Sequence, residues 1–433
     1  DEVSQNFRDL TGQMNFSNDD FIRTTEPRHK LACQEIWRRL QERGHIRLGN
    51  YAGWYSVRDE AFFTETEVVD GKAPTGAPVE WLEEPSYFFN LSHWQQPLLD
   101  FYAKNPDFVG PESRFNEVKS FVKGGLRDLS VSRTSFKWGI PVPGDPDHVM
   151  YVWLDALTNY LTASGWPGDG ASGDQKKYET LWPADLHMVG KDILRFHAVY
   201  WPAFLMAAEL PLPKRVYAHG WWTNEGQKIS KSLGNVIDPN ALTAQYGLDQ
   251  TRYFLMREVP FGNDGDFSAT AMVHRMNGDL ANDFGNLCQR VLSMIFKNCD
   301  AVMPALPEQP SAIDTELMTA ADGLLDQVRD MLDRQAFNEA LRCIWQVVAD
   351  ANRYVDTTAP WALKKTDPKR MAEVLAVLAE TIRQVAILVQ PVMPQSAAMV
   401  LDQLGVDSAA RDFRFIAGQQ RLSAGYVIEK PVP

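Results

Sequence analysis

Apolar residues near the start of the chain are spaced as in helices. Between residues 27 and 40, helical spacing relates Leu31, Ile36, Trp37 and Leu40. Residues 1–48 are therefore predicted to form two helices joined by a turn. A strand-like link is predicted at residues 21–25, where Phe, Ile and Thr gather.

The next segment, residues 49–125, has a different pattern. Short aromatic and β-branched runs alternate there with Gly and Pro, as in strands separated by turns. These runs are Tyr51 to Val57, Phe62-Phe63 and Tyr87-Phe88-Phe89. The segment is predicted to be a mixed α/β insertion.

From residue 149 onward the pattern predicts strands that alternate with helices. Val149 to Trp153 is a continuous apolar run, as in a buried parallel strand, and Asp155 follows where a helix cap would lie. Further strands are predicted at residues 185–190 and 215–220, around a helix at 192–208 that Pro202 should bend. This alternation predicts a doubly wound, parallel, Rossmann-like α/β sheet.

After about residue 270 the strand pattern disappears. Helical periodicity covers four long segments: Met272 to Cys299, Asp314 to Met331, Ala336 to Val355, and Met371 to Val389. A Pro-rich connection at residues 303–310 separates the first two. This part of the chain is predicted to be an all-α helical bundle.

Composition changes this picture little. The 433 residues are 45% hydrophobic and 23% charged, as in a soluble globular protein of several domains. No apolar run could cross a bilayer, and the polar N-terminus is not a signal peptide. The net charge of −13 argues against a nucleic-acid partner unless basic residues form a local patch.

The four cysteines also limit the chemistry. Cys33, Cys288, Cys299 and Cys343 form no CxxC pair, which argues against a structural zinc site. They lie in helix-like sequence, so they are expected to be small buried residues in a reducing compartment.

One loop carries residues suited to a triphosphate. Lys228-Ile229-Ser230-Lys231-Ser232 lies between Gly226 and Gly234. Two lysines can neutralise phosphate oxygens, and hydroxyl and loop N–H groups can donate further hydrogen bonds. A solvated surface loop with two lysines is the alternative interpretation of these five residues alone.

The loop resembles the KMSKS signature of class I aminoacyl-tRNA synthetases, with Ile229 in place of Met. Several further stretches are similar to the methionyl-tRNA synthetase family and follow in the family's order. They are residues 53–60 (GWYSVRDE), 151–156 (YVWLDA), 189–193 (VGKDI), 352–356 (NRYVD) and 359–361 (APW). The resemblance extends over essentially the whole chain.

The resemblance implies activation of L-methionine by ATP to methionyl-adenylate, followed by transfer to tRNA(Met). Lys231 matches the lysine that stabilises the pyrophosphate leaving group, and Lys228 and Ser230 would support it. Gly190, Asp192, His219 and Gly220 match the ATP-binding positions. Taken without the family, Asp192 could instead cap the following helix.

The resemblance also implies a pocket for the methionine side chain. Its candidate residues are Trp153, Ala156, Leu157, Tyr160, Ile193 and His197. A thioether favours aromatic contact, so the residue types fit. Ordinary packing in the core is the alternative for the two aromatic residues.

Four positions in the helical part match residues that read the CAU anticodon: Asn286, Arg290, Asp356 and Trp361. An aromatic ring can stack on an unpaired base, and polar groups can bond to base edges. For Asn286 and Arg290, the alternative is a solvated helix face.

The second class I signature, HIGH, is not found. The nearest string, residues 44–49 (GHIRLG), lacks a preceding strand. The family pattern places HIGH and the anchor of the substrate amino group before Asp1. We expect that this segment is missing from the sequence; its supply by another chain is the alternative.

The family pattern predicts five segments. They are the rest of the first catalytic half (1–35), a zinc-free connective insertion (36–130), the second catalytic half (131–222), the KMSKS loop with a stem-contact region (223–270), and the anticodon-binding bundle with its tail (271–433). Residues 49–130 contain no cysteine, so no zinc is expected. ATP with Mg²⁺, a cytoplasmic location, no membrane and a monomer are expected.

Two competing interpretations remain at this stage. Another class I synthetase, for cysteine, leucine or valine, would need zinc ligands or a larger editing insertion. A non-catalytic tRNA-binding protein would explain the missing HIGH but not Lys231 or the pocket around Trp153.

Overall fold

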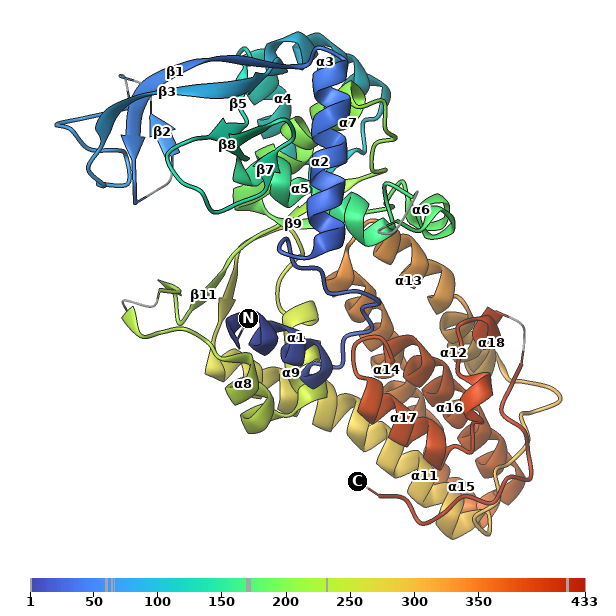
Figure 1. The fold of residues 1–433 in the computed structure, drawn as a ribbon. Coiled ribbons are helices and arrows are strands. Elements are labelled where there is room, and N and C mark those ends of the chain that lie inside the picture. Colours follow the sequence, from blue (N-terminus) through green and yellow to red (C-terminus); the bar gives the residue numbers. More distant parts are fainter. Residues whose placement is uncertain are drawn as a thin grey trace. The chain divides into compact units, whose positions relative to one another are not determined.

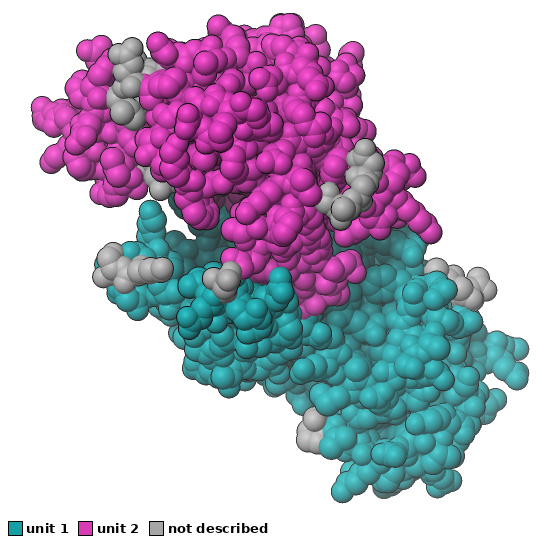
Figure 2. All heavy atoms as spheres, in the orientation of Figure 1, with its two compact units in different colours: residues 1–15, 220–433 teal, residues 16–219 magenta. Residues whose placement is uncertain are grey.

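The computed structural model describes residues 2–58, 61–63, 65, 67–168, 173–230, 233–417 and 420–432. The chain divides into two compact units, which Figure 2 colours separately. Unit 2 comprises residues 16–219, and unit 1 comprises residues 1–15 with 220–433. The predicted segments 1–35 and 131–222 are each divided between the two units, and the predicted border at 35/36 lies inside the helix Pro27–Glu42.

Unit 2 contains the predicted parallel sheet (Figure 1). Its strand order is β4 (Val109–Gly110), β10 (Val216–His219), β9 (His187–Gly190), and both pairings are parallel. The predicted strands at 185–190 and 215–220 are thus confirmed. The helices α2 (Pro27–Glu42), α5 (Val152–Ser164) and α7 (Trp201–Ala207) contribute fully buried side chains to the same hydrophobic core.

The insertion of unit 2 is an antiparallel sheet with helices. Its strand order is β2 (Ala61–Phe63), β1 (Ile46–Ser56), β3 (Glu80–Phe89), β5 (Leu129–Ser130). The short helix η1 (Leu91–Trp94) and the helices α3 (Gln95–Lys104) and α4 (Glu112–Lys123) follow β3. The prediction of a mixed α/β insertion is confirmed.

The predicted strand-like link at residues 21–25 is wrong. The segment is irregular and ends in a turn before α2. The Glu26 carboxylate accepts hydrogen bonds from the Arg23 backbone N–H (3.1 Å) and the Arg28 side chain (2.6 Å). Pro27 in the first turn of α2 favours a helix start here, so local bonds replace strand pairing.

The predicted parallel strand at 149–153 is also wrong in direction and length. β8 (Asp145–Met150) pairs antiparallel with β6 (Ser132–Arg133) and β7 (Pro141–Val142). α5 starts at Val152 after Tyr151, so Asp155 lies within its first turn and is not its cap. An apolar run does not reveal strand direction, because partners elsewhere in the chain decide it.

The predicted helix at 192–208 is irregular. It consists of the 3₁₀ turn η2 (Lys191–Ile193), the π-helical turn η3 (Phe196–Tyr200) and α7, with Pro202 in the first turn of α7. Proline lacks an N–H to continue the α-helical ladder, which accounts for an irregularity at this place.

Unit 1 contains a small sheet, and the lysine-bearing loop follows its strand β12. The strand order is β12 (Gln227–Lys228), β11 (Trp222–Asn224), β13 (Gly265–Phe267). The helices α1 (Glu2–Gln13), α8 (Pro239–Tyr246) and α9 (Leu248–Arg257) belong to the same unit.

The rest of unit 1 is the predicted helical bundle. Its elements are α10 (Ala269–Arg275), η5 (Met276–Gly285, π-helical), α11 (Asn286–Asn298), α12 (Ala312–Asp322), α13 (Leu324–Asp333), α14 (Phe337–Thr358), α15 (Pro360–Thr366), α16 (Pro368–Val389), α17 (Pro394–Gln403), η6 (Ser408–Ala410) and α18 (Arg414–Ala417). α16 is buried along most of its length, and its Glu380 and Arg383 pair with each other at 2.7 Å. Among the described residues, no helix is long and apolar enough to span a membrane.

Candidate functional site

The candidate methionine residues of α5 share one helix face. Trp153, Ala156, Leu157 and Tyr160 follow at i, i+3, i+4 and i+7. The Trp153 ring stacks on Phe196 of η3, with centroids 3.4 Å apart and an interplanar angle of 8°. Leu157 is 1% exposed and belongs to the core, whereas Trp153 and Tyr160 are partly exposed. Trp153 and Tyr160 are therefore accessible in part, although Tyr160 also packs against the core.

Tyr160 and His197 form the polar end of this face. The Tyr160 hydroxyl lies 2.7 Å from His197 Nε2, and His197 Nδ1 lies 2.9 Å from the Ile193 carbonyl oxygen. A carbonyl can only accept, so Nδ1 carries the proton and Nε2 accepts from the tyrosine. Burial lowers the pKa of His197 and raises the pKa of Tyr160 to about 12. The pair is therefore neutral at pH 7.

Two residues that the sequence did not indicate support this pair. His187 of β9 stacks on Tyr160, with ring centroids 4.0 Å apart. Trp201 Nε1–H donates to His187 Nε2 at 3.2 Å, and burial lowers the pKa of His187 to about 3. The signal available in the sequence was the place of His187 within the strand predicted at residues 185–190.

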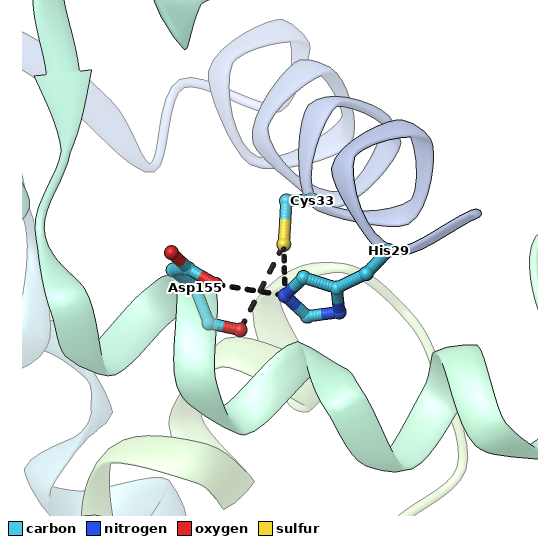
Figure 3. A group of neighbouring side chains, drawn as sticks. All are labelled: His29, Cys33 and Asp155. Atoms are coloured by element: carbon cyan, nitrogen blue, oxygen red, sulfur yellow. Dashed lines mark hydrogen bonds and ion pairs between the residues drawn. The ribbon is translucent and has the colours of Figure 1, made fainter. Parts of the chain in front are cut away.

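Figure 3 shows side chains that join α2 to α5. His29 of α2 is fully buried; its Nε2 lies 2.7 Å from Asp155 Oδ1 and its Nδ1 lies 3.0 Å from Thr162 Oγ1. Cys33, one turn along α2, has its Sγ 3.2 Å from His29 Nε2 and 3.7 Å from the Asp155 carbonyl oxygen. Two positions of α5, Asp155 and Thr162, are thus bonded to one imidazole.

The same three residues could in principle supply metal ligands. His29, Cys33 and Asp155 place their donor atoms within 4.8 Å of one another. However, the imidazole and carboxylate are already bonded to each other, and burial raises the pKa of the Cys33 thiol. A metal would need the thiolate, so the geometry fits a hydrogen-bonded clamp better. The absence of zinc stays a prediction.

The candidate ribose residues lie at the carboxyl ends of β9 and β10. Gly190 is the register partner of His219, and Asp192 follows within η2. A Cβ on Gly190 would lie 2.5 Å from Asp192 Oδ1, so a larger residue would require this carboxylate to move. Ligands of open α/β sheets bind at this end of the strands. Asp192 is not the helix cap; Gly190 holds that position.

Gly220 needs to be glycine for a different reason. A Cβ there would lie 2.1 Å from the backbone oxygen of Asn263 within unit 1. The residue thus permits close packing of two backbone segments.

The lysine-bearing loop follows the β11–β12 hairpin. Asn235 joins its two sides, because its Oδ1 accepts from the Ser230 backbone N–H (2.8 Å) and its Nδ2 donates to the Lys228 carbonyl (3.0 Å). Lys228 is exposed, with its ammonium 6.0 Å from the centroid of the Trp221 ring. Lys231 and Ser232 lie outside the described residues.

Asp266 of β13 fixes the hairpin from the other side. Its Oδ1 accepts from Thr223 Oγ1 (2.5 Å) and from the Gly226 backbone N–H (2.8 Å). The hydrogen bond from Thr223 lowers the pKa of Asp266. Sequence patterns did not single out Asn235 or Asp266, although Gly226, at φ +75°, marks the turn.

The four anticodon candidates lie on α11 and around the junction of α14 with α15. Arg290 Nη2 pairs with Asp356 Oδ1 at 3.0 Å, and the Arg290 guanidinium carbon lies 5.9 Å from the Trp361 ring centroid. Trp361 is 52% exposed, and the exposed Asn286 lies one turn before Arg290. The left-handed Ala359, at φ +42°, ends α14 and turns the chain into α15. The structure therefore brings Arg290, Asp356 and Trp361 together.

Comparison with known proteins decides the family. The family of class I tRNA synthetases (M) matches residues 1–80 and 75–292, and the anticodon-binding domain of methionyl tRNA ligase matches residues 305–432. The chain belongs to the methionyl-tRNA synthetases. It is therefore a class I ligase that forms an aminoacyl-tRNA.

Relatives agree along the full chain. The methionine–tRNA ligase of Rickettsia conorii is 55% identical over 434 residues, with 100% of this chain and 84% of the relative covered. That of Rhizobium meliloti is 54% identical over 435 residues, with 99% of this chain and 83% of the relative covered.

Solved structures agree on the fold. The Mycobacterium tuberculosis methionyl-tRNA synthetase in complex with methionyl-adenylate matches with a TM-score of 0.93 and 52% identity, covering 98% of this chain and 84% of that one. The apo form of the same enzyme matches with a TM-score of 0.91 and 50% identity, covering 99% and 85%. The synthetase thus has the predicted catalytic α/β fold and the helical anticodon-binding domain.

Proposed function

We propose that the protein activates L-methionine with ATP and transfers the methionyl group to tRNA(Met), using the residues described above. In the first step a methionine carboxylate oxygen attacks the α-phosphorus, and the bond to the bridging oxygen of pyrophosphate breaks. In the second step a terminal hydroxyl of tRNA attacks the methionyl carbonyl, and AMP leaves. The observation that carries this proposal is the neutral Tyr160–His197 pair on the aromatic face of α5.

A neutral pair suits a thioether. Charged groups would favour a charged or strongly polar side chain, whereas methionine sulfur is a weak acceptor and favours aromatic contact. Trp153 and Phe196 supply stacked rings beside the pair. We assign Ala156, Leu157 and Ile193 to the apolar walls of the same pocket.

The nucleotide is assigned to the strand ends and to the loop. Asp192 would accept hydrogen bonds from ribose hydroxyls, and Gly190 and His219 lie next to it. Lys228, Ser230 and Lys231 would stabilise the negative charge that develops on pyrophosphate. Mg²⁺ would enter with ATP, held by phosphate oxygens. Gly220 would keep the backbone compact beside the adenine.

The tRNA anticodon is assigned to Asn286, Arg290, Asp356 and Trp361. An exposed indole beside a guanidinium offers a stacking surface with polar groups at its edge. A monomer in the cytoplasm is our proposal for the working state.

Pyrophosphate exchange tests this function. In the full-length protein, labelled pyrophosphate should enter ATP when methionine is present and should not when leucine replaces it. Methionine should also be joined to tRNA(Met) in the same preparation. Equal exchange with leucine would contradict the assignment of the pocket, and exchange without amino acid would contradict adenylate formation.

A further inference from the structure

The short helix that carries Trp361 has few contacts of its own. α15 contains seven residues, and in the described part of the bundle none of its side chains is hydrogen-bonded to another helix. Pro360 is buried, and Leu363 packs partly against the core. A helix this short is not stable by itself. Its position therefore depends on the helices that precede and follow it.

One buried carboxylate joins these two flanking helices. Asp314 of α12 is 0% exposed, and its Oδ1 accepts from the Tyr354 hydroxyl of α14 at 2.5 Å. Its two oxygens also accept from the Arg370 guanidinium of α16, at 2.6 and 2.7 Å. Tyr354 lies before α15 in the chain and Arg370 lies after it. Asp314 thus fixes both segments that lead to Trp361.

The pair between Asp314 and Arg370 is ionic and directional. Burial raises the pKa of Asp314, but hydrogen bonds from Arg370 and Tyr354 more than offset this and lower it to about 2. The Ser311 backbone N–H also donates to Asp314 Oδ2, at 2.9 Å. A guanidinium that donates twice to one carboxylate fixes orientation as well as distance. The other carboxylate near Arg370, Glu373 at 3.5 Å, lies on α16 itself and joins no second helix.

The contacts among the anticodon candidates are weaker. Asp356 pairs with Arg290 at 3.0 Å, but both side chains are exposed. The Trp361 ring centroid lies 5.9 Å from the same guanidinium. Exposed ion pairs contribute little to stability, so these contacts alone do not fix the indole. Stacking on an unpaired base requires a ring held in one place.

We propose that Asp314 is a positioning residue for anticodon recognition. Through Tyr354 and Arg370 it holds α15 so that the Trp361 ring can stack on an anticodon base. Asp314 itself does not touch the RNA, because it is fully buried. The proposal rests on the anticodon assignment made above and names the group that holds the stacking residue in place.

Aminoacylation kinetics of Asp314→Asn in the full-length protein test this role. Asparagine keeps the size and an acceptor for Tyr354 but loses the ion pair with Arg370. The KM for tRNA(Met) should rise by at least about 5-fold, the lower end of the contribution of one stacked base. The rise should not exceed that in Trp361→Ala, and pyrophosphate exchange should not change. An unchanged KM would overturn the proposal.

Glu380→Gln is the matched control. Glu380 is 1% exposed and pairs with Arg383 at 2.7 Å in the same bundle, but its bonds lie within α16 and to the tail. Both variants should lower the melting temperature, whereas only Asp314→Asn should raise the KM for tRNA(Met). An equal rise in both would mean that any weakening of the bundle has this effect, and the proposal would be wrong.

A double-mutant cycle separates positioning from general stability. When Trp361 is already replaced by Ala, Asp314→Asn should raise the KM for tRNA(Met) little further, because the residue that it positions is gone. Additive effects would overturn the proposal. If Asp314→Asn does not fold, Tyr354→Phe takes its place in the cycle. It removes one hydrogen bond, and its effect should likewise disappear without Trp361.

Trp361→Ala alone shows which assignment fails. If this variant leaves the KM for tRNA(Met) unchanged, the anticodon assignment is wrong and the role of Asp314 falls with it. If Trp361→Ala raises the KM and Asp314→Asn does not, the anticodon assignment stands and only the role of Asp314 is refuted.

Discussion

Tyr160 and His197 illustrate what single residues contribute to the candidate pocket. They lie 37 positions apart, and their hydrogen bond of 2.7 Å forms only because α5 and η3 lie side by side. The Ile193 carbonyl fixes the tautomer of the imidazole. At the residue scale, the proposed specificity for a thioether therefore depends on the proton that His197 carries on Nδ1.

Replacing Tyr160 by Phe tests this hydrogen bond. Tyr160→Phe leaves His197 Nε2 without its donor, at a cost of about 1 kcal/mol. We expect the KM for methionine in pyrophosphate exchange to rise about 3- to 10-fold, with a smaller change in kcat. Tyr246→Phe, on α8, is the matched control and should leave both constants unchanged. An unchanged KM in Tyr160→Phe would remove the residue from the pocket.

Lys231 belongs to the loop that we assign to pyrophosphate. Lys231→Ala should reduce the rate of adenylate formation by about 100-fold or more, as for other groups that stabilise developing charge. The affinity for methionine, measured by calorimetry, should stay the same. Lys214→Ala, a surface lysine paired with Asp185, is the control. Normal activation kinetics in Lys231→Ala would refute the role of the loop.

Trp361 is the residue that we expect to stack on an anticodon base. Trp361→Ala should weaken tRNA(Met) binding by about 1–3 kcal/mol, the usual contribution of one stacked base. Pyrophosphate exchange should not change, because it needs no tRNA. Trp138→Ala, another exposed tryptophan, is the control. Full charging activity in Trp361→Ala at limiting tRNA would contradict the assignment.

At the scale of elements, His29 of α2 holds α5 in place at two positions, Asp155 and Thr162. The bonds to Asp155 and Thr162 join residues more than 120 positions apart, and Asp155 lies between the pocket residues Trp153 and Ala156. The hairpin that precedes the lysine loop is held similarly, by Asp266 and Asn235. For α5 and for the hairpin alike, polar residues outside the candidate site hold the element on which the candidate site residues lie.

Removing the clamp should affect both stability and substrate binding. His29→Gln loses the buried bond to Asp155, so we expect the free energy of unfolding to fall by about 2 kcal/mol. The KM for methionine should rise as α5 loses its fixed position, while tRNA affinity should stay the same. His274→Gln, at an exposed position, is the control. If stability falls but the KM for methionine does not change, His29 stabilises the fold without positioning the pocket.

At the scale of the whole molecule, buried neutral histidines make stability depend on pH. The pKa of His187 is lowered to about 3 and that of His197 is lowered as well, both chiefly by burial. Below pH 6.5 the unfolded chain binds protons that the folded protein does not. Stability from these groups is therefore present above pH 6.5 and is lost as the pH falls.

Urea unfolding between pH 7 and pH 5 measures this effect. The free energy of unfolding should decrease on acidification, with His187 contributing about 1.4 kcal/mol per pH unit below 6.5. His187→Asn should reduce the dependence of the free energy of unfolding on pH, and His274→Gln should leave that dependence as in the parent protein. An equal slope in the parent and His187→Asn would show that His187 is protonated in the fold.

Much of the fold could be predicted because it depends on local patterns. The strands around 187–190 and 216–219, the helix from Pro27 and the bundle after residue 270 follow from apolar periodicity and from Pro and Gly signals. The direction of β8 could not be predicted, because β6 and β7 determine it. The break of the 314–331 helix at Gly323 also escaped the pattern, since its apolar spacing continues across the break.

By itself, the sequence determined the family, the order of α/β and all-α parts, and the residue types of the candidate site, because motifs and periodicity are local properties of a chain. The tertiary structure decided which of these residues meet: Tyr160 bonds to His197, and His29 bonds to Asp155 and Thr162. Such features depend on side chains distant in sequence. Their burial changes hydrogen bonding and pKa values, which no local pattern records.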